Sequence, residues 1–190
     1  MTVAQARRQA PPARRVALLR GVNLGAAKPL AMPALLAVAE SLGWTGLATH
    51  LRSGNLLFDA SLSDDEAAIA LREALRVQLG LDSAVVIRSG ARLAKLVATH
   101  PFAGGDPART VIACCDQVVS AEATQRLEQL VANGEQVQVD GADIFAAFPN
   151  GQASSKLALG LTSAVQPAQA TARNLRTMTK LAELAAGPAT

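Results

Sequence analysis

The sequence is poor in aromatic residues: its 190 residues include four Phe, one Trp and no Tyr. Small α/β domains that recognise RNA stack bases on aromatic side chains of their central strands. The first predicted strand here, Val16-Ala17-Leu18-Leu19, contains no aromatic residue. The composition therefore argues against RNA recognition on the face of a sheet.

Histidine is scarce as well, and His50 and His100 are the only two in the chain. A Ser-His-Asp triad would need one of them beside an activated serine, and the sequence has no nucleophile-elbow motif. The ligand spacing of a zinc site is absent, as are a phosphate loop and a dinucleotide fingerprint. We therefore predict structural roles for both histidines, no metal site and no cofactor.

Long apolar runs are also missing, and none approaches the roughly 20 residues that span a bilayer, so we expect no membrane partner. Cys114 and Cys115 are adjacent, and on a strand they would point to opposite faces and could not easily pair. Two cysteines without a secretory signal predict a reducing, cytoplasmic location. A vicinal redox or metal role and two small buried apolar residues are both open interpretations.

Positive charge is concentrated at the N-terminus. Residues 1–15 carry four arginines, two prolines and no acidic residue, which predicts a disordered basic leader. The net charge is +3, of which these arginines supply +4, so the remaining residues carry a net −1. This partition argues against a broad nucleic-acid-binding face on the folded body.

Apolar periodicity predicts the elements of the first half. Val16–Leu19 is a continuous apolar run, which is typical of a central strand. A helix near residues 32–42 follows, and Ser63-Asp64-Asp65-Glu66 is a capping box that opens a second helix. The other strands of this half are predicted at residues 48–52, 55–59 and 84–88, with Ser53-Gly54 in the turn of a hairpin.

The second half repeats this order. Strands are predicted at residues 110–115, 136–139, 144–148 and 169–173, and helices at 121–133, at 154–160 and after Asn174. Asp140-Gly141 is a strong hairpin signal. We therefore predict an α+β fold of two ferredoxin-like β-α-β-β-α-β plait subdomains in tandem. Residues 16–88 form the first plait, 89–108 a linking helix and loop, and 109–190 the second plait with a C-terminal helix.

Several motifs resemble those of a bacterial family, the domain of unknown function 1697. They are Arg20-Gly21-Val22-Asn23-Leu24-Gly25, the helix at Met32, Ser53-Gly54-Asn55, Pro149-Asn150-Gly151 with Ser155-Lys156, and Ala172-Arg173-Asn174 with Thr177 and Lys180-Leu181. The similarity runs from about Arg15 to Ala185. It implies two α/β plaits and no assigned activity.

The chain departs from the usual pattern of that family at two places. Ala26 stands where a second glycine is usual, and Leu175-Arg176 stand where Trp and Asn are usual. If that Trp stacks on a ligand in relatives, this protein lacks the contact.

Strand direction in a plait predicts one polar cluster in each subdomain. The end of the first strand and the turn between the second and third strands lie at one edge of the sheet. The first cluster therefore consists of Arg20, Asn23, Ser53 and Asn55. The third and fourth strands of the second subdomain also end at a shared edge. The second cluster therefore consists of Asn150, Ser155, Lys156, Arg173 and Asn174, followed by Thr177 and Lys180 on the C-terminal helix.

These residue types suit an anion. Lys156 lies at a helix start beside a glycine-containing loop, and Arg20 and Arg173 can form bidentate contacts with phosphate or carboxylate. We hypothesise that a small anionic ligand, phosphorylated ligands included, binds between the subdomains. Local roles fit the same residues: Ser53-Gly54 as a turn, Asn174 as a helix cap and Lys156 facing water.

Three other interpretations stay open. Lys, Arg, Asn and Ser side chains can support phosphoryl or acyl chemistry through positioning, so an enzyme of unknown reaction is one, with no catalytic residue named. Nucleic-acid binding at the polar clusters, aided by the leader, is another. A protein-interaction module is the third, with Trp44 as an exposed anchor; the competing interpretation is a Trp that closes a helix–sheet corner.

Overall fold

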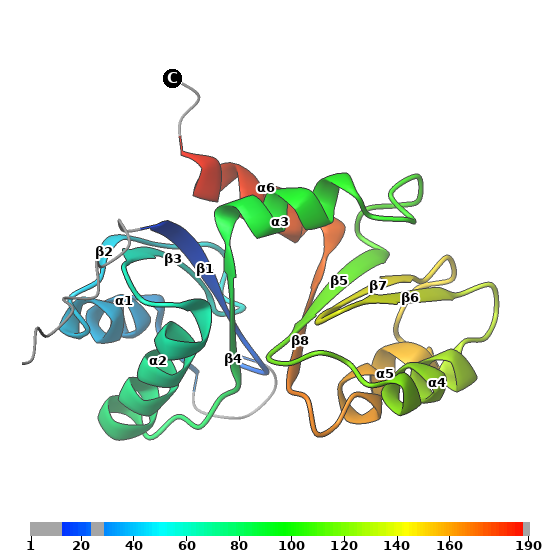
Figure 1. Cartoon of the computed structure of the whole chain (residues 1–190), viewed down its shortest axis with the longest axis horizontal. Helices are drawn as coiled ribbons and strands as arrows, with labels where there is room; N and C mark the ends of the chain where they lie inside the picture. The colour runs from blue at the N-terminus through cyan, green and yellow to red at the C-terminus, as the bar shows by residue number, and fades with distance from the viewer. Residues whose placement is uncertain (1–12, 24–28, 188–190) are drawn as a thin grey trace, which may run out of the picture.

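The first sheet has the strand order and direction of a ferredoxin-like plait. The computed structural model describes residues 13–23 and 29–187. The sheet contains β1 (Ala13–Leu19), β2 (Thr45–Thr49), β3 (Asn55–Ala60) and β4 (Val85–Ser89). Their order is β2-β3-β1-β4, and all neighbours are antiparallel. Helices α1 (Met32–Ser41) and α2 (Asp64–Leu79) cover one face of this sheet (Figure 1).

The second sheet repeats this topology. It contains β5 (Thr110–Cys115), β6 (Gln136–Asp140), β7 (Asp143–Ala147) and β8 (Ala170–Asn174), in the order β6-β7-β5-β8. Helices α4 (Ala121–Leu130) and α5 (Lys156–Ala164) cover its outer face (Figure 1). The predicted α+β fold of two plaits in tandem is therefore confirmed.

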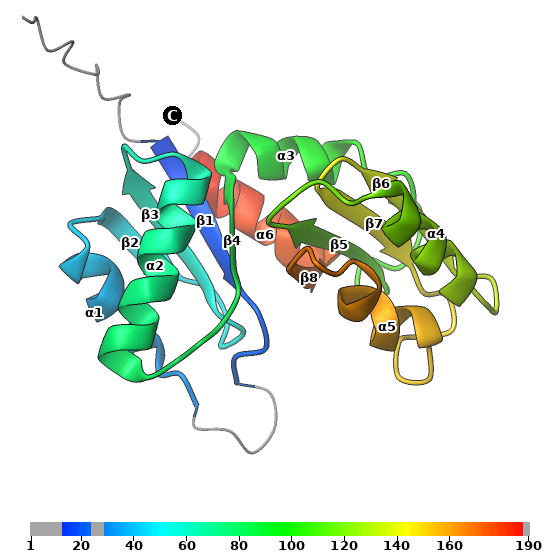
Figure 2. The ribbon, with the colours of Figure 1, turned by 60° about the horizontal axis from the view of Figure 1, so that its bottom comes forward.

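Two further helices join the plaits. α3 (Gly90–Ala98) follows β4, α6 (Leu175–Ala186) follows β8, and the two helices pack against each other. Figure 2 shows α6 crossing from the end of β8 to β1 of the first sheet. At their contact, a residue larger than glycine would not fit at position 90, because a Cβ on Gly90 would lie 2.8 Å from Ala185 Cβ. The predicted linking helix is thus part of the packed structure.

A central core lies between the sheets and these two helices. It contains Val16, Leu18 and Leu57 from the first sheet, Ile112 and Phe145 from the second, and Leu93, Met178 and Leu181 from α3 and α6. The sheet faces that plaits use to stack RNA bases are therefore buried here. This agrees with the shortage of aromatic residues. At the edge of the second sheet, Gln136, Gln138 and Asp140 of β6 stay exposed on the side away from α4 and α5, and none of them is aromatic.

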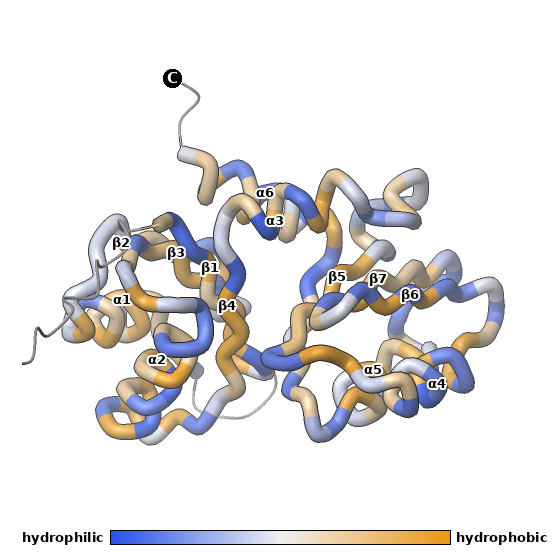
Figure 3. Tube along the Cα trace, in the orientation of Figure 1, coloured by the Kyte–Doolittle hydropathy of each residue, from blue (hydrophilic) through white to orange (hydrophobic). Residues whose placement is uncertain are grey.

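The apolar run at residues 16–19 is explained by burial on both sides. Val16 and Leu18 point into the central core, whereas Ala17 and Leu19 point into the core under α1 and α2. All four residues are fully buried. Apolar stretches are also visible along β4 in Figure 3. No described helix is both long enough and apolar enough to cross a bilayer.

Several local predictions are confirmed. The capping box at α2 is present: Ser63 Oγ accepts a hydrogen bond from Glu66 N, and Glu66 Oε2 accepts one from Ser63 N at 2.9 Å. Gly80 ends the helix in the left-handed conformation. Cys114 and Cys115 are buried and point to opposite faces of β5, into different cores. They are the two small buried residues of the second interpretation above.

The bounds of the predicted leader need correction, and one of the two interpretations of Trp44 is excluded. β1 begins at Ala13, so the predicted leader does not extend to residue 15; residues 1–12 lie outside the described residues. Arg15 pairs with Asp64 at 2.8 Å, and Arg14 with Asp59 at 3.3 Å, which fixes this end of the strand. Trp44 is 6% exposed and stacks on Phe58 with 4.0 Å between ring centroids. It closes a helix–sheet corner and is not a surface anchor.

Candidate functional site

Arg173 connects the two plaits. It lies in β8 of the second sheet, and its guanidinium reaches the end of β1 and the turn before β3 in the first sheet. Its five hydrogen bonds, 2.7–2.9 Å long, go to Asn55 Oδ1, Leu19 O, Ser53 O, Thr171 Oγ1 and Ala172 O. A guanidinium has five N–H donors. Arg173 therefore has none left for a ligand, and its role is to hold the subdomains together.

This arginine is a half-buried cation without a carboxylate partner among the described residues. Burial lowers the pKa of Arg173 to about 10, so the side chain stays protonated at neutral pH. Carbonyl and amide oxygens stabilise its charge in place of a carboxylate. The arrangement depends on these oxygens being held in position by the fold.

Asn55 holds the turn that accepts Arg173. Its side chain is fully buried, and its Nδ2 donates to His50 O at 2.8 Å and to Ser53 Oγ at 3.0 Å. Gly54 has φ +76°, and a Cβ there would lie 2.4 Å from Val22 Cγ2. Only glycine fits this contact. The Ser-Gly-Asn motif is thus a turn built to dock against β1 and β8.

Arg20 and Asn23 both follow β1, and their side chains contact different segments. Arg20 Nη1 donates to Gln169 Oε1 of the second subdomain at 2.9 Å. Asn23 has a left-handed backbone, with φ 59°. Its side chain binds Leu30 N at 2.7 Å and the carbonyl of Arg52. Asn23 therefore ties the chain after β1 to the hairpin turn of Ser53 and Asn55, whereas the side chain of Arg20 is bound to Gln169 instead.

The second predicted cluster is divided between two faces of the second sheet. Arg173 faces the first subdomain, whereas α5, with Lys156 at its first position, covers the opposite face (Figure 1). Asn150 Nδ2 donates to Asn133 O. Ser155 is buried, and its Oγ accepts a hydrogen bond from Ala158 N. Lys156 is exposed and is not joined to Arg173. A shared strand end does not place side chains on the same side of a sheet.

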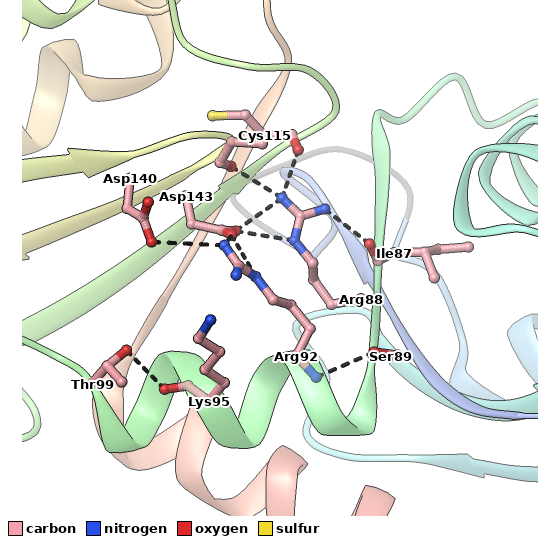
Figure 4. A network of polar contacts seen from close by, with 10 residues as sticks. Ile87, Arg88, Ser89, Arg92, Lys95, Thr99, Cys115, Asp140 and Asp143 are labelled. Atoms are coloured by element: carbon pink, nitrogen blue, oxygen red, sulfur yellow. Dashed lines mark hydrogen bonds and ion pairs between the residues drawn. The ribbon is translucent and has the colours of Figure 1, made fainter.

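A second connection between the plaits was not predicted from the sequence. Asp143 of β7 is 2% exposed in its side chain and binds two arginines of the first half of the chain (Figure 4). Its Oδ1 accepts from Arg88 at 2.9 Å, and its Oδ2 accepts from Arg92 at 2.7 Å. The sequence contains one signal for this connection, an acidic residue at the start of a buried strand. A buried carboxylate requires a cationic partner.

A pocket beside α6 is lined by residues of both subdomains, and we call it the junction pocket. Its volume is about 570 Å³, and its lining residues are His50, Leu51, Pro107, Arg176, Thr177, Thr179, Lys180 and Glu183. Asn174 caps α6 by accepting from Thr177 N at 2.9 Å. This cap fixes the first turn of α6, where Arg176 and Thr177 lie. The predicted residues Thr177 and Lys180 thus line a pocket between the plaits.

The charges around the junction pocket are mainly positive. Arg176 makes no side-chain hydrogen bond or ion pair with any described residue, whereas Lys180 Nζ lies 3.1 Å from Glu183 Oε2. Leu51 is 55% exposed and has φ +60°, an uncommon conformation for leucine. A pocket of about 550 Å³ also lies on the second plait, but its Arg109 and Asp106 pair with each other. The junction pocket therefore has an excess of positive charge, whereas the charges of the pocket on the second plait cancel.

Comparison with known proteins agrees with the observed fold. Residues 13–145, more than half of the chain, match the family described as "Protein of unknown function (DUF1697)". The chain belongs to this family. The structure of conserved bacterial protein SP0830 from Streptococcus pneumoniae is similar, with a TM-score of 0.74 and 21% sequence identity, over 92% of this chain and 99% of that chain. That likeness concerns the fold. No curated protein matches the chain.

The structure gives physical roles to motifs by which the chain resembles DUF1697 proteins. Gly54 and Asn55 build the turn, Arg173 binds it, and Asn174 caps α6. Leu175 is buried in the central core, and Arg176 lines the junction pocket. The motif positions Leu24-Gly25 and the departure at Ala26 lie outside the described residues. The family match ends at residue 145, before the Asn150 and Arg173 motifs.

His100 and the two cysteines of this DUF1697 protein have structural surroundings, whereas His50 lines the junction pocket. His100 is buried, with Nδ1 accepting from Phe102 N and Nε2 beside Val111 O. Burial lowers the pKa of His100 and raises the pKa of both thiols, that of Cys115 to about 12. Within residues 13–23 and 29–187, no group of three or more His, Cys, Asp or Glu side chains is arranged to hold a metal ion.

Proposed function

We propose that this protein binds a small organic anion in the junction pocket. The observation that carries the proposal is the gathering of Arg176, Lys180 and His50 around one pocket that has a single carboxylate, Glu183. That carboxylate already pairs with Lys180. Arg176 is therefore the cation that is free to receive a carboxylate or phosphate of the ligand.

The walls of the pocket define the rest of the ligand. Leu51 and Pro107 offer apolar surface on two sides, and the half-buried Thr177 offers a hydroxyl. A volume of about 570 Å³ lies within the range of about 300–1,000 Å³ of small-molecule sites. These features suit a molecule with an apolar body and one anionic group. Phosphorylated metabolites and organic carboxylates both have this chemistry.

The Arg173–Asn55 contact supports the proposal by fixing the pocket walls. The turn with His50 and Leu51 belongs to the first subdomain, and α6 follows directly from β8 of the second. Arg173 and Asn55 join these two parts next to the pocket. A preformed pocket loses less conformational entropy on binding than one that must first assemble.

We place the protein in the cytoplasm because its two cysteines are buried and unpaired.

Thermal shift and calorimetry test the proposal. The wild-type chain is titrated with organic carboxylates, sugar phosphates, nucleotides and short oligonucleotides, beside the variants R176Q and K180Q. K156Q is the matched control because Lys156 is an exposed cation on the outer face of the second plait. A ligand at 100 times its Kd adds about 2.7 kcal/mol of stability. We expect R176Q to weaken binding about tenfold or more and K156Q to leave it unchanged.

Three outcomes contradict the proposal. No compound of the panel binds, R176Q and K156Q lose equal affinity, or R176Q and K180Q each bind the ligand as tightly as the wild type. Oligonucleotide binding that survives both pocket variants supports the nucleic-acid alternative instead. A truncation that probes the basic N-terminus should then remove residues 1–12. Removal of residue 13 onward would cut into β1.

A further inference from the structure

A smaller pocket lies at the other end of β8. Its lining residues are Arg20, Gly21, Arg72, Asp82, Ser83, Ala84 and Gln169, and its volume is about 280 Å³. We call it the Arg20 pocket. Gln169 precedes β8, whereas the junction pocket is formed by residues that follow it. The two pockets share no lining residue, so ligand binding can be tested separately in each.

The backbone of Arg20 is fixed on both sides. Its N–H donates to Ala84 O at 2.9 Å, and its carbonyl accepts from Ser83 Oγ at 2.8 Å. Ser83 is 5% exposed. The chain segment before β4 therefore holds the start of this side chain in place. A cationic side chain whose backbone is already held in place loses less conformational entropy when it binds an anion.

The guanidinium of Arg20 is oriented but not saturated. Nη1 donates to Gln169 Oε1 at 2.9 Å, and this is its one side-chain contact with a described residue. Arg20 takes part in none of the ion pairs of the described chain. This differs from Arg173, whose five N–H groups all have acceptors. Arg20 therefore presents several N–H donors to the pocket in a direction set by Gln169.

A second guanidinium lies in the same pocket. Arg72 of α2 donates through Nε and Nη2 to Asp82 Oδ1, at 3.2 and 2.9 Å. Its Nη1 has no acceptor among the described residues. Two arginines and one carboxylate give the pocket a net charge of +1, and the carboxylate is bound to Arg72 rather than to Arg20. An entering anion would gain from both guanidinium groups and be opposed by Asp82.

We propose that the Arg20 pocket binds a tetrahedral oxyanion, as inorganic phosphate or as the phosphate group of a larger molecule. Guanidinium groups match the oxygens of phosphate with paired N–H donors. The pocket is smaller than the about 300 Å³ of typical drug-sized sites, which suits a single charged group. It has no apolar residue larger than alanine in its lining, unlike the junction pocket. The Arg20 pocket thus suits the charged group alone, whereas the junction pocket suits a ligand with an apolar body, and this proposal does not depend on the function proposed above.

The test is calorimetric titration of the full chain with inorganic phosphate and with methyl phosphate. We expect R20Q to raise the Kd about tenfold or more. R76Q is the matched control because Arg76 lies one turn further along α2, is exposed and pairs with Glu73. It should leave the Kd unchanged. R176Q, in the junction pocket, should also leave phosphate binding intact.

A second variant reports through a gain of affinity. Asp82 is 68% exposed in its side chain, so D82N is expected to fold. It removes the opposing carboxylate and frees Arg72, and phosphate should then bind several-fold more tightly. If methyl phosphate binds more tightly than inorganic phosphate, the ligand is the phosphate group of a larger molecule. If inorganic phosphate binds more tightly, the ligand is the free ion. The proposal is overturned if neither anion binds, if D82N binds more weakly, or if R76Q loses as much affinity as R20Q.

Discussion

Arg173 Nε lies 2.7 Å from Asn55 Oδ1, although 118 positions separate the two residues in the sequence. The contact joins a strand of the second plait to the hairpin turn of the first. Asn55 uses its amide nitrogen for the turn itself and its amide oxygen for Arg173. A single asparagine therefore shapes one subdomain and attaches it to the other.

Replacement of either partner should destabilise the protein. R173Q leaves buried carbonyl and amide oxygens without a donor, and we expect it to lower the free energy of unfolding by about 3 kcal/mol. N55A should have a similar effect. In a double-mutant cycle measured by urea unfolding, the two changes should couple by about 1–2 kcal/mol. Additive effects would contradict the contact; K156Q, at an exposed position, is the control and should change stability by less than about 0.5 kcal/mol.

The Asp143 cluster should matter at least as much. D143N removes the charge that pairs with Arg88, whose side chain is 13% exposed, and leaves that cation uncompensated. Loss of one partner of a buried pair costs about 3–5 kcal/mol. The matched control is D82N, which breaks an exposed pair and should cost less than about 1 kcal/mol. Equal midpoints of denaturant unfolding for the two variants would show that burial of the cluster has no energetic effect.

Gly54 should tolerate no side chain. G54A places a Cβ 2.4 Å from Val22 Cγ2 and 2.9 Å from Leu19 Cβ, in addition to the cost of a positive φ. G141A is a suitable control because Gly141 also has a positive φ of 61°, with nothing within 4 Å of its added Cβ. The control should lose about 1 kcal/mol from backbone strain alone. G54A should lose clearly more, about 3 kcal/mol, since overpacking adds its own cost.

His100 should make stability depend on pH. Its folded pKa is lowered by burial, so between pH 7 and 5 the unfolded chain takes up a proton at this position before the folded chain does. Stability should therefore fall as the pH drops through about 6.5, with a slope of at most about 1.4 kcal/mol per pH unit from this group. Unfolding curves at several pH values measure the slope. H100Q should lose this component and H50Q should keep it; identical slopes in wild type and H100Q would contradict the assignment.

The fold could be predicted because each element carries a local signal. The continuous apolar run at residues 16–19 indicated a strand buried on both faces, and the Ser63 capping box and the Asp140-Gly141 turn marked element boundaries. Packing of α3 against α6 could not be predicted in this way. Their apolar stripes are visible in the sequence, but the surface that a stripe covers depends on how the two plaits dock.

Prediction of the site failed at the same level of structure. Sheet-edge arguments place residues within one sheet. They grouped Asn23 with the Ser53 turn, and Asn23 binds Arg52 O beside that turn, but the side chain of Arg20 is hydrogen-bonded to Gln169 of the second subdomain. They assigned Arg173 to the second cluster. Strand direction within one sheet does not show which residue of the other subdomain a strand residue contacts. The Arg88–Asp143 pair was missed for the same reason. Polar residues that connect domains resemble ligand-binding residues in sequence, since both are charged side chains near strand ends.

The position of α6 has a consequence for how a nascent chain folds. This helix is the last described element to leave the ribosome, yet it packs on β1, the first. During translation the first plait can complete its outer core early, while the inner face of its sheet stays open to water. That face is closed only when the C-terminal helix is released. Premature termination before residue 175 should therefore yield a product that exposes apolar strand residues and is a substrate for chaperones or proteases.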